Sequence, residues 1–291
     1  MRPHALILIA SLALGCGDDG GDGAANEAAL RAARCQPSNT TRSAVIARFG
    51  FVRPAMNNAA VAEGLNLDNR VSTSGDSLGC RQADFTSPTG EAGIDNQLAR
   101  LLPVVDAMTG GAFDGAIQGA VNNGQLLVGI SLEGIDDPQN DPCVTLAFTR
   151  VSGSPFVDSN MLLDKGQTYE LQRDRPVTRV SAALRNGVVT AGPFLLPLPI
   201  TVLDANFVLN LHQAQIRATL REDGSLEGVI GGGISVSEFS DQVRTLTISQ
   251  TEMNTITGAL RVFADLAPEN GRCQQISAGI RFLAREAFLQ P

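Results

Sequence analysis

Residues 186–235 carry the clearest secondary-structure pattern in the chain and read NGVVTAGPFLLPLPITVLDANFVLNLHQAQIRATLREDGSLEGVIGGGIS. In two successive runs, apolar residues alternate with polar ones, which is typical of strands that have one face toward solvent. The apolar positions are Ala205, Phe207, Leu209 and Leu211 in the first run, then Ala214, Ile216, Ala218 and Leu220 in the second. Because the second run is one residue out of phase, a bulge or a new strand must separate the two.

Two dipeptides in this region predict tight turns. Asn186-Gly187 and Asp223-Gly224 both suit the left-handed backbone that two-residue hairpin turns require. The first would lead into the proline-containing segment, and the second would lead into a strand at Leu226–Ile230. The middle of the chain is therefore predicted to be extended and antiparallel.

Three prolines mark one side of the segment Phe194–Val202. Pro193, Pro197 and Pro199 all fall on odd positions. In an extended chain, successive N–H groups point to opposite sides, so the three missing donors would lie along the same side. We therefore expect an edge strand, or a strand whose outer side meets a loop.

This segment is apolar on both faces and needs a cover. The favoured interpretation is a well-covered core strand, since apolar strands usually pack inside; the alternative is a groove between sheet and helices that holds an apolar ligand or lipid. The candidate ligand contacts are Phe194, Leu196, Leu198 and Ile200.

The rest of the chain adds strands and helices. Apolar residues at helical spacing predict helices at Ile94–Ala107 and Ala112–Asn122, and shorter C-terminal helices near 237–265. Further strands are predicted at Ser43–Arg53, Gly64–Val71, Leu126–Ile135, Cys143–Val151, Thr168–Gln172, Arg179–Arg185 and Gln274–Arg285. The predicted fold class is α+β, with a β-rich, mainly antiparallel sheet (a sandwich or an open barrel) and a helical pair near 94–122.

Composition limits the domain number and the partners. The chain has 291 residues, of which 43% are hydrophobic, and this suffices for one large core. No linker divides residues 35–291, so we expect a single domain there. The net charge of −8 and the lack of a basic run argue against a nucleic-acid partner.

The N-terminus indicates export. Arg2 precedes a short apolar run, Ala5–Leu14, and small residues lead from there to Cys16. This order is typical of a signal peptide over residues 1–15. The segment Leu12–Cys16 resembles the cleavage site of bacterial lipoproteins, although Ala13 stands where such sites usually carry leucine. The resemblance implies a lipid on Cys16 that binds the membrane. Ordinary secretory cleavage before the same cysteine is the alternative.

The residues after Cys16 form a predicted tether. Residues 16–34 include a run of Gly and Asp that cannot bury apolar surface and is typical of a flexible segment.

Four further cysteines predict disulfides. An even number in an exported chain indicates two bridges with three possible pairings, and no Cys-x-x-Cys spacing favours zinc or redox chemistry. These cysteines are Cys35, Cys80, Cys143 and Cys273.

Signal, tether, cysteines and an Arg/Ala/Gly-rich body together resemble a myxobacterial-type bacterial lipoprotein of uncharacterised function. The resemblance is one of signal and composition, and it implies no activity. It implies a place at the bacterial cell envelope, on the outer membrane or facing the periplasm. A secreted protein is the alternative.

Gly75–Gly79 matches the Gly-x-Ser-x-Gly motif of serine hydrolases, and its first four letters resemble the signature of GDSL esterases. The serine of such a motif, here Ser77, sits between a buried strand and a helix, and the flanking sequence predicts neither. His212 is the one histidine after the signal, and it lies on the polar face of a predicted strand. A serine without a base is not activated, so a serine hydrolase is an unfavoured alternative.

Two acidic loops are candidates for Ca²⁺. The first contains Asp84 and Asp95 and faintly resembles the calcium loops of thrombospondin type 3 repeats; the second contains Asp136, Asp137 and Asp141. Calcium takes six to eight oxygen ligands of this kind, but the favoured interpretation is that these residues form ordinary polar turns. We expect no cofactor, with Ca²⁺ as the possible exception.

Taken together, these patterns predict an exported, lipid-anchored protein with a non-enzymatic binding or structural role at the cell envelope. The alternatives are a carrier of an apolar ligand or lipid, and the serine hydrolase.

Overall fold

The computed structural model describes residue 35 and residues 38–202, 205–244 and 249–291. The chain divides into two units, Met1–Gln36 and Pro37–Pro291, and the described helices and strands belong to the second. The predicted signal peptide, most of the predicted tether and Cys16 lie outside the described residues, so these remain predictions.

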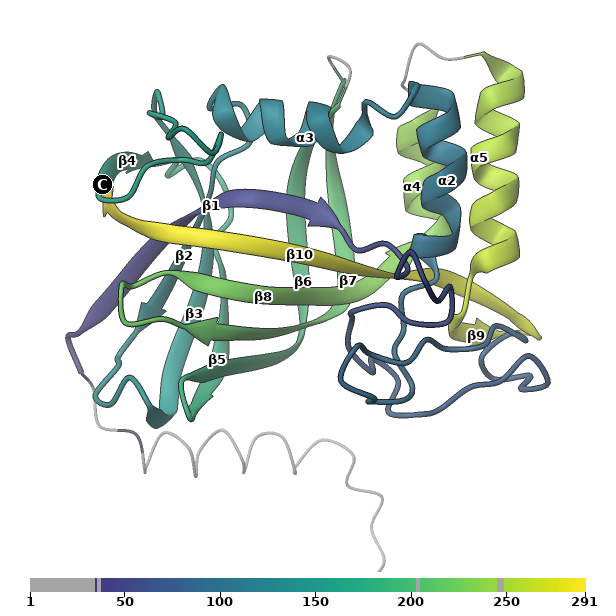
Figure 1. The fold of residues 1–291 in the computed structure, drawn as a ribbon, viewed down its shortest axis with the longest axis horizontal. Coiled ribbons are helices and arrows are strands. Elements are labelled where there is room, and N and C mark those ends of the chain that lie inside the picture. Colours follow the sequence, from purple (N-terminus) through teal and green to yellow (C-terminus); the bar gives the residue numbers. More distant parts are fainter. Residues whose placement is uncertain (1–34, 36–37, 203–204, 245–248) are drawn as a thin grey trace, which may run out of the picture. The chain divides into compact units, whose positions relative to one another are not determined.

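The second unit is built on a closed antiparallel barrel, visible in Figure 1. Eight described strands follow one another around it in chain order: β1 (Thr41–Phe51), β2 (Val128–Glu133), β3 (Asn140–Ser152), β5 (Thr178–Arg185), β6 (Val188–Val202), β7 (Ala205–Leu220), β8 (Leu226–Ser235) and β10 (Arg272–Gln290). The last strand closes the barrel by pairing with both β8 and β1.

The predicted fold class, α+β with a β-rich and mainly antiparallel sheet, is confirmed. The sheet is neither a sandwich nor an open barrel, however, because β10 is long enough to pair along β1 on one side and β8 on the other. Closure through β10 pairs the first and last strands of the ring, which would be the edges of an open sheet. Two short strands lie outside the ring: β4 (Gln167–Leu171) pairs with the end of β10, and β9 (Leu266–Glu269) pairs with its start.

The alternating pattern of the central stretch is realised in one strand. Both apolar runs belong to β7, and the phase change between them is a bulge at His212–Gln215. The bulge keeps apolar residues on both sides of it on the buried face, including Leu211 and Ala214, which are fully buried. At the predicted hairpin, Asn186 and Gly187 both have positive φ, as a two-residue turn requires.

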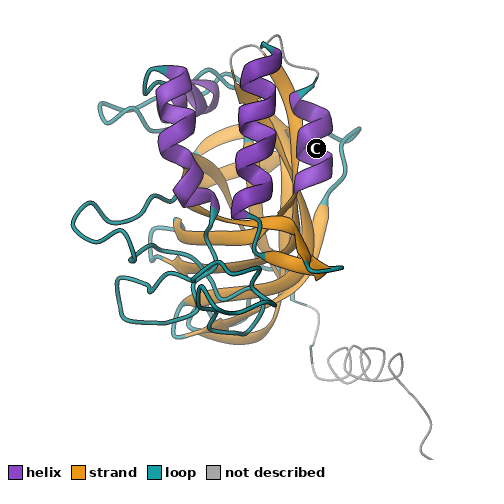
Figure 2. Cartoon of the chain, turned by 90° about the vertical axis from the view of Figure 1, so that its right-hand side faces the viewer, coloured by secondary structure: helices purple, strands orange, loops and turns teal. Residues whose placement is uncertain are grey.

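Four described helices pack beside the barrel. Figures 1 and 2 show α2 (Leu98–Thr109), α4 (Val236–Val243) and α5 (Gln250–Phe263) standing next to one another, while α3 (Phe113–Asn122) lies across β1 and β6. The buried face of α3 contributes to the main core. Both the helical pair and the C-terminal helices were predicted.

The segment before α2 is irregular, and the strand predicted at Gly64–Val71 is wrong. Only isolated bridges form here, such as the one between Leu65 and Asp95. Side chains accept hydrogen bonds from the backbone N–H groups that a strand would use: Asn66 Oδ1 accepts from Arg70 N–H (3.0 Å), and Asp95 Oδ2 accepts from Leu67 N–H (2.6 Å).

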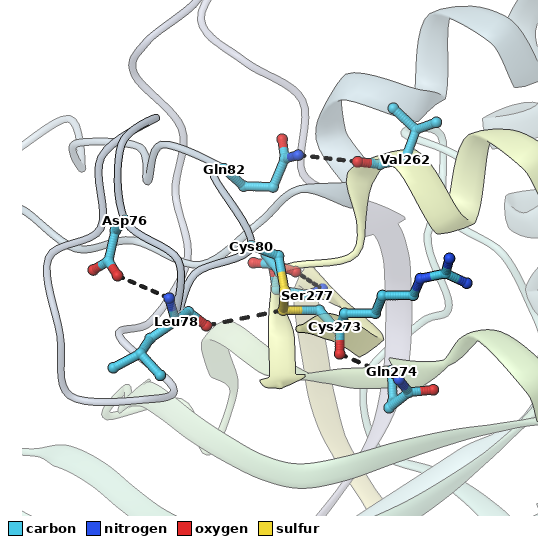
Figure 3. Close-up of a disulfide and its surroundings, with 10 residues drawn as sticks. Asp76, Leu78, Cys80, Gln82, Val262, Cys273, Gln274 and Ser277 are labelled. Carbon is cyan, nitrogen blue, oxygen red and sulfur yellow. Dashed lines mark hydrogen bonds between the residues drawn. A yellow bond between two sulfur atoms is a disulfide. The ribbon is translucent and has the colours of Figure 1, made fainter. Parts of the chain in front are cut away.

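A disulfide fastens this irregular segment to the barrel. Cys80 is bonded to Cys273 at the start of β10, 193 residues away, as Figure 3 shows. Nearby, Gln82 Nε2 donates to the carbonyl of Val262 in α5 (2.9 Å). The segment is therefore held against both a strand and a helix.

Candidate functional site

The proline-containing part of β6 pairs on one side only. Val188–Ala191 pair with β5, whereas described pairs beyond Ala191, as far as Val202, join β6 to β7 alone. The expected one-sided strand is thus confirmed. The physical reason is that Pro197 and Pro199 have no N–H to offer on the side away from β7.

The barrel has a gap in its hydrogen bonding between β5 and this part of β6. β5 begins at Thr178, and its first residues pair with β3 but not with β6. The first half of β5 and the second half of β6 are therefore not joined by ladder hydrogen bonds in the described pairing.

An open cleft of about 590 Å³, a volume that includes its solvent-filled mouth, lies at this opening. It is lined by Val128, Phe148, Thr149, Arg150, Arg175, Pro176, Thr178, Leu196, Pro197, Leu198, Pro199 and Val208.

The interior of the cleft is apolar. Leu196 and Leu198 are each 1% exposed, and Phe148 is stacked on Phe194 with a centroid distance of 5.9 Å. Of the four predicted ligand contacts, Leu196 and Leu198 line the cleft, and Phe194 packs on a residue that does. The side chain of Ile200 lies outside the described residues.

A smaller apolar cavity adjoins the cleft, and the two share Val128, Leu198 and Pro199. Its lining includes Val121 of α3 and Ile46 of β1. The apolar space beneath β6 is therefore bounded by both sheet and helix.

Two arginines lie at this cleft. Arg150 follows Phe148 by two residues on β3, so both side chains leave the same face of the strand. The loop that carries Arg175 is fixed by backbone bonds: Gln172 N–H donates to the Arg150 carbonyl (3.0 Å), and Arg175 N–H donates to the Gln172 carbonyl (3.1 Å). Burial and, to a lesser extent, the charge of Arg175 lower the pKa of Arg150.

Sequence reasoning missed these arginines. They lie 25 residues apart, in different elements, and no local motif connects them. Only the pairing of β3 with β5 and the fold of the intervening loop bring them to one cleft.

The acidic residues of the first predicted calcium loop bind backbone amides. Asp84 accepts from Ser72 N–H (2.5 Å), and its pKa is raised mainly by burial. Asp95 is 2% exposed; burial raises its pKa to about 8 against the hydrogen bond from Leu67, and the charge of Asp265 adds to the rise.

Asp265 is a second buried carboxylate, and the sequence did not single it out. Both of its oxygens are bound by Ser277, one by the backbone N–H (2.7 Å) and one by the hydroxyl (2.6 Å). The same hydroxyl accepts from Gln97 N–H (2.8 Å), which links the start of α2 to β10. Burial raises the pKa of Asp265 to about 7, although the hydrogen bonds from Ser277 oppose the rise.

The second acidic loop is the turn between β2 and β3. Asp141 accepts from the N–H groups of Asp136 and Cys143 (both 2.7 Å), and Asp137 accepts from Gln139 N–H (2.8 Å). Within the described part of the chain, no group of three or more His, Cys, Asp or Glu side chains is placed to hold a metal ion. Calcium binding stays a prediction.

The hydrolase motif lies in a series of turns. Asp76 N–H donates to Thr73, and Ser77 accepts from Cys80 N–H through its carbonyl, so the residues around Ser77 form no strand-to-helix elbow. His212 lies on β7, and its Nε2 is 3.1 Å from Glu238 Oε2 in α4. Asn210 donates to the same carboxylate oxygen, and no described hydrogen bond joins Ser77 to His212.

Disulfide bonding, predicted from the cysteine count, is present. The Cys80–Cys273 bond is one of the pairings that the sequence left open, and Cys35 and Cys143 are also disulfide-bonded. No helix among the described residues is long and apolar enough to cross a bilayer. Comparisons with protein-family models, with curated proteins and with solved structures give no match to this chain.

Proposed function

We propose that this protein is an exported, non-enzymatic binding protein whose barrel holds a small apolar ligand in the cleft beneath β6. The observation that carries the proposal is the cleft itself, which lies where the barrel wall is open and has Leu196 and Leu198 in its lining. An eight-stranded barrel is just wide enough for side chains to fill or for one small ligand.

The lining of the cleft suits such a ligand, because small-molecule sites are mostly apolar with a few polar groups. The cleft lining is largely apolar, and the few polar groups stand on β3, on β5 and just before β5. This combination favours an apolar body in the interior and a polar end toward solvent.

The prolines support a ligand in preference to an added strand. A peptide that extended the sheet at β6 would need backbone donors from Pro197 and Pro199, and proline has none. The open side of β6 is therefore suited to apolar contact and ill suited to strand addition.

Export and membrane attachment are part of the proposal. Disulfides are typical of oxidising compartments, which agrees with the signal peptide predicted from the sequence. A lipid on Cys16 would then keep the binding domain at the bacterial cell envelope, in keeping with the resemblance to a myxobacterial-type lipoprotein.

Titration with the neutral fluorescent probe N-phenyl-1-naphthylamine tests the binding function. The chain contains no tryptophan, so a single introduced one reports on its own surroundings. Val208 lines the cleft and is 45% exposed, so we expect Val208→Trp to fold, to narrow the cleft and to weaken probe binding at least tenfold.

Val262→Trp on α5 is the matched control, because Val262 is 64% exposed and does not line the cleft. It should bind the probe like the parent protein. Absence of saturable binding by the parent protein, or equal binding by the two tryptophan variants, would refute the proposed function.

A further inference from the structure

The charge of the cleft differs from that of the whole chain. The protein carries a net charge of −8, yet the described residues that line the cleft include two arginines and no carboxylate. The cleft is therefore a local positive site.

The two arginines are near enough to affect each other. Burial is the main cause that lowers the pKa of Arg150, the charge of Arg175 adds to the effect, and the charge of Asp174 opposes it. Arg150 donates to the carbonyl of Gln125 (3.4 Å), and no described ion pair joins it to a carboxylate. Arg175 has one acidic neighbour, Asp174, at 3.5 Å, and both side chains are more than half exposed.

An anion between the two guanidinium groups would relieve this repulsion. Guanidinium presents a planar set of donors that matches carboxylate and phosphate oxygens. A half-buried arginine gains more from such a partner than an exposed one, since less water screens the charges. The cleft thus offers a site for negative charge directly beside its apolar interior.

We infer that the ligand is a single-chain amphiphile with an anionic head group, whose apolar chain lies against Leu196, Leu198 and Phe148 while Arg150 and Arg175 hold the head. This inference rests on the proposed function, since it names the class of ligand for the same cleft.

Displacement of the neutral probe by three amphiphiles of equal chain length tests the inference. Decanoate, decanol and decyltrimethylammonium are compared at pH 8, all below the concentrations at which they aggregate. For the parent protein we expect decanoate to bind about tenfold more tightly than decanol, and the cation to bind most weakly. High salt should weaken decanoate binding and leave decanol binding unchanged, because salt screens the charge interaction alone.

Variants of the two arginines test separately how the protein recognises the head group and how it binds the apolar chain. Arg150→Gln/Arg175→Gln should lose the preference for decanoate and keep its affinity for decanol. Arg175→Gln should lose part of the preference, and because Arg175 is exposed this variant tests the idea even where the double variant does not fold. Arg173→Gln is the control, since Arg173 is an exposed arginine that does not line the cleft.

Two different outcomes would contradict the inference, and only one of them would also contradict the proposed function. If decanol displaces the probe and decanoate binds no better, or if the double variant keeps the preference, the anionic head group is refuted while the binding function stands. If neither the probe nor any amphiphile binds the parent protein, the proposed function and the inference fail together.

Discussion

Replacing Asp265 by asparagine should remove a large pH-dependent loss of folding stability. Asp265 is 3% exposed, and burial raises its pKa to about 7 from an ordinary value of 3.8. Between these two pH values the folded protein keeps a proton that the unfolded chain has released. Its contribution to stability is therefore fully present below about pH 4 and is lost as the pH rises through about 7.

The size of the effect follows from the pKa difference. At about 1.4 kcal/mol per pH unit, the whole change is on the order of 4 kcal/mol, and about 3 kcal/mol of it falls between pH 5 and pH 8.5. Asparagine is neutral at both pH values and can still accept from Ser277 N–H. We therefore expect Asp265→Asn to match the parent protein below about pH 4, where the parent carboxyl group is also neutral, and to gain about 3 kcal/mol relative to the parent protein between pH 5 and pH 8.5.

Urea denaturation at several pH values measures this difference. Groups remote from Asp265 contribute equally to both proteins, whereas Asp95 titrates differently in the variant because the charge of Asp265 raises its pKa in the parent protein. Ser277→Ala is the second variant. The Ser277 hydroxyl lowers the pKa of Asp265, so its removal should extend the pH-dependent loss of stability to higher pH instead of abolishing it. A difference between parent protein and Asp265→Asn that stays constant from pH 5 to pH 8.5 would refute the reasoning.

Two further predictions concern folding stability. The disulfide Cys80–Cys273 closes a loop of 193 residues, so chain entropy predicts that the variant with serine at both positions is less stable by about 5 kcal/mol; an unchanged urea midpoint would contradict this. At the start of α5, Ser249 and Glu252 form a capping box, and Ser249→Ala should cost about 1 kcal/mol in the same assay, whereas Ser249→Asp should retain most of the stability.

Local patterns predicted the local structure well. The alternation in β7, the Asn186-Gly187 turn and the one-sided prolines of β6 all depend on neighbouring residues, and each is confirmed. The strand predicted at Gly64–Val71 is wrong. Its composition is compatible with a strand, but the side chains of Asn66 and Asp95 accept hydrogen bonds from the backbone N–H groups of this segment, so it does not need a partner strand.

The candidate site was predicted in part. Leu196 and Leu198 could be named from the sequence because an apolar strand with prolines along one side is conspicuous. Arg150 and Arg175 could not, since arginines are frequent in this chain and nothing local distinguishes these two. The unusual chemistry of Asp265 comes from its burial against Ser277, which adjacent residues do not reveal.

The sequence by itself determined which segments are extended, where they turn and which side of β6 lacks donors, because periodicity and proline chemistry act between neighbours. Tertiary structure alone decided that the sheet closes through β10, that β5 and β6 part to leave a cleft, and that two arginines meet there. These features depend on which strands pair and how far each ladder runs. Pairing brings together residues that are distant in the chain, so no short stretch of sequence contains it.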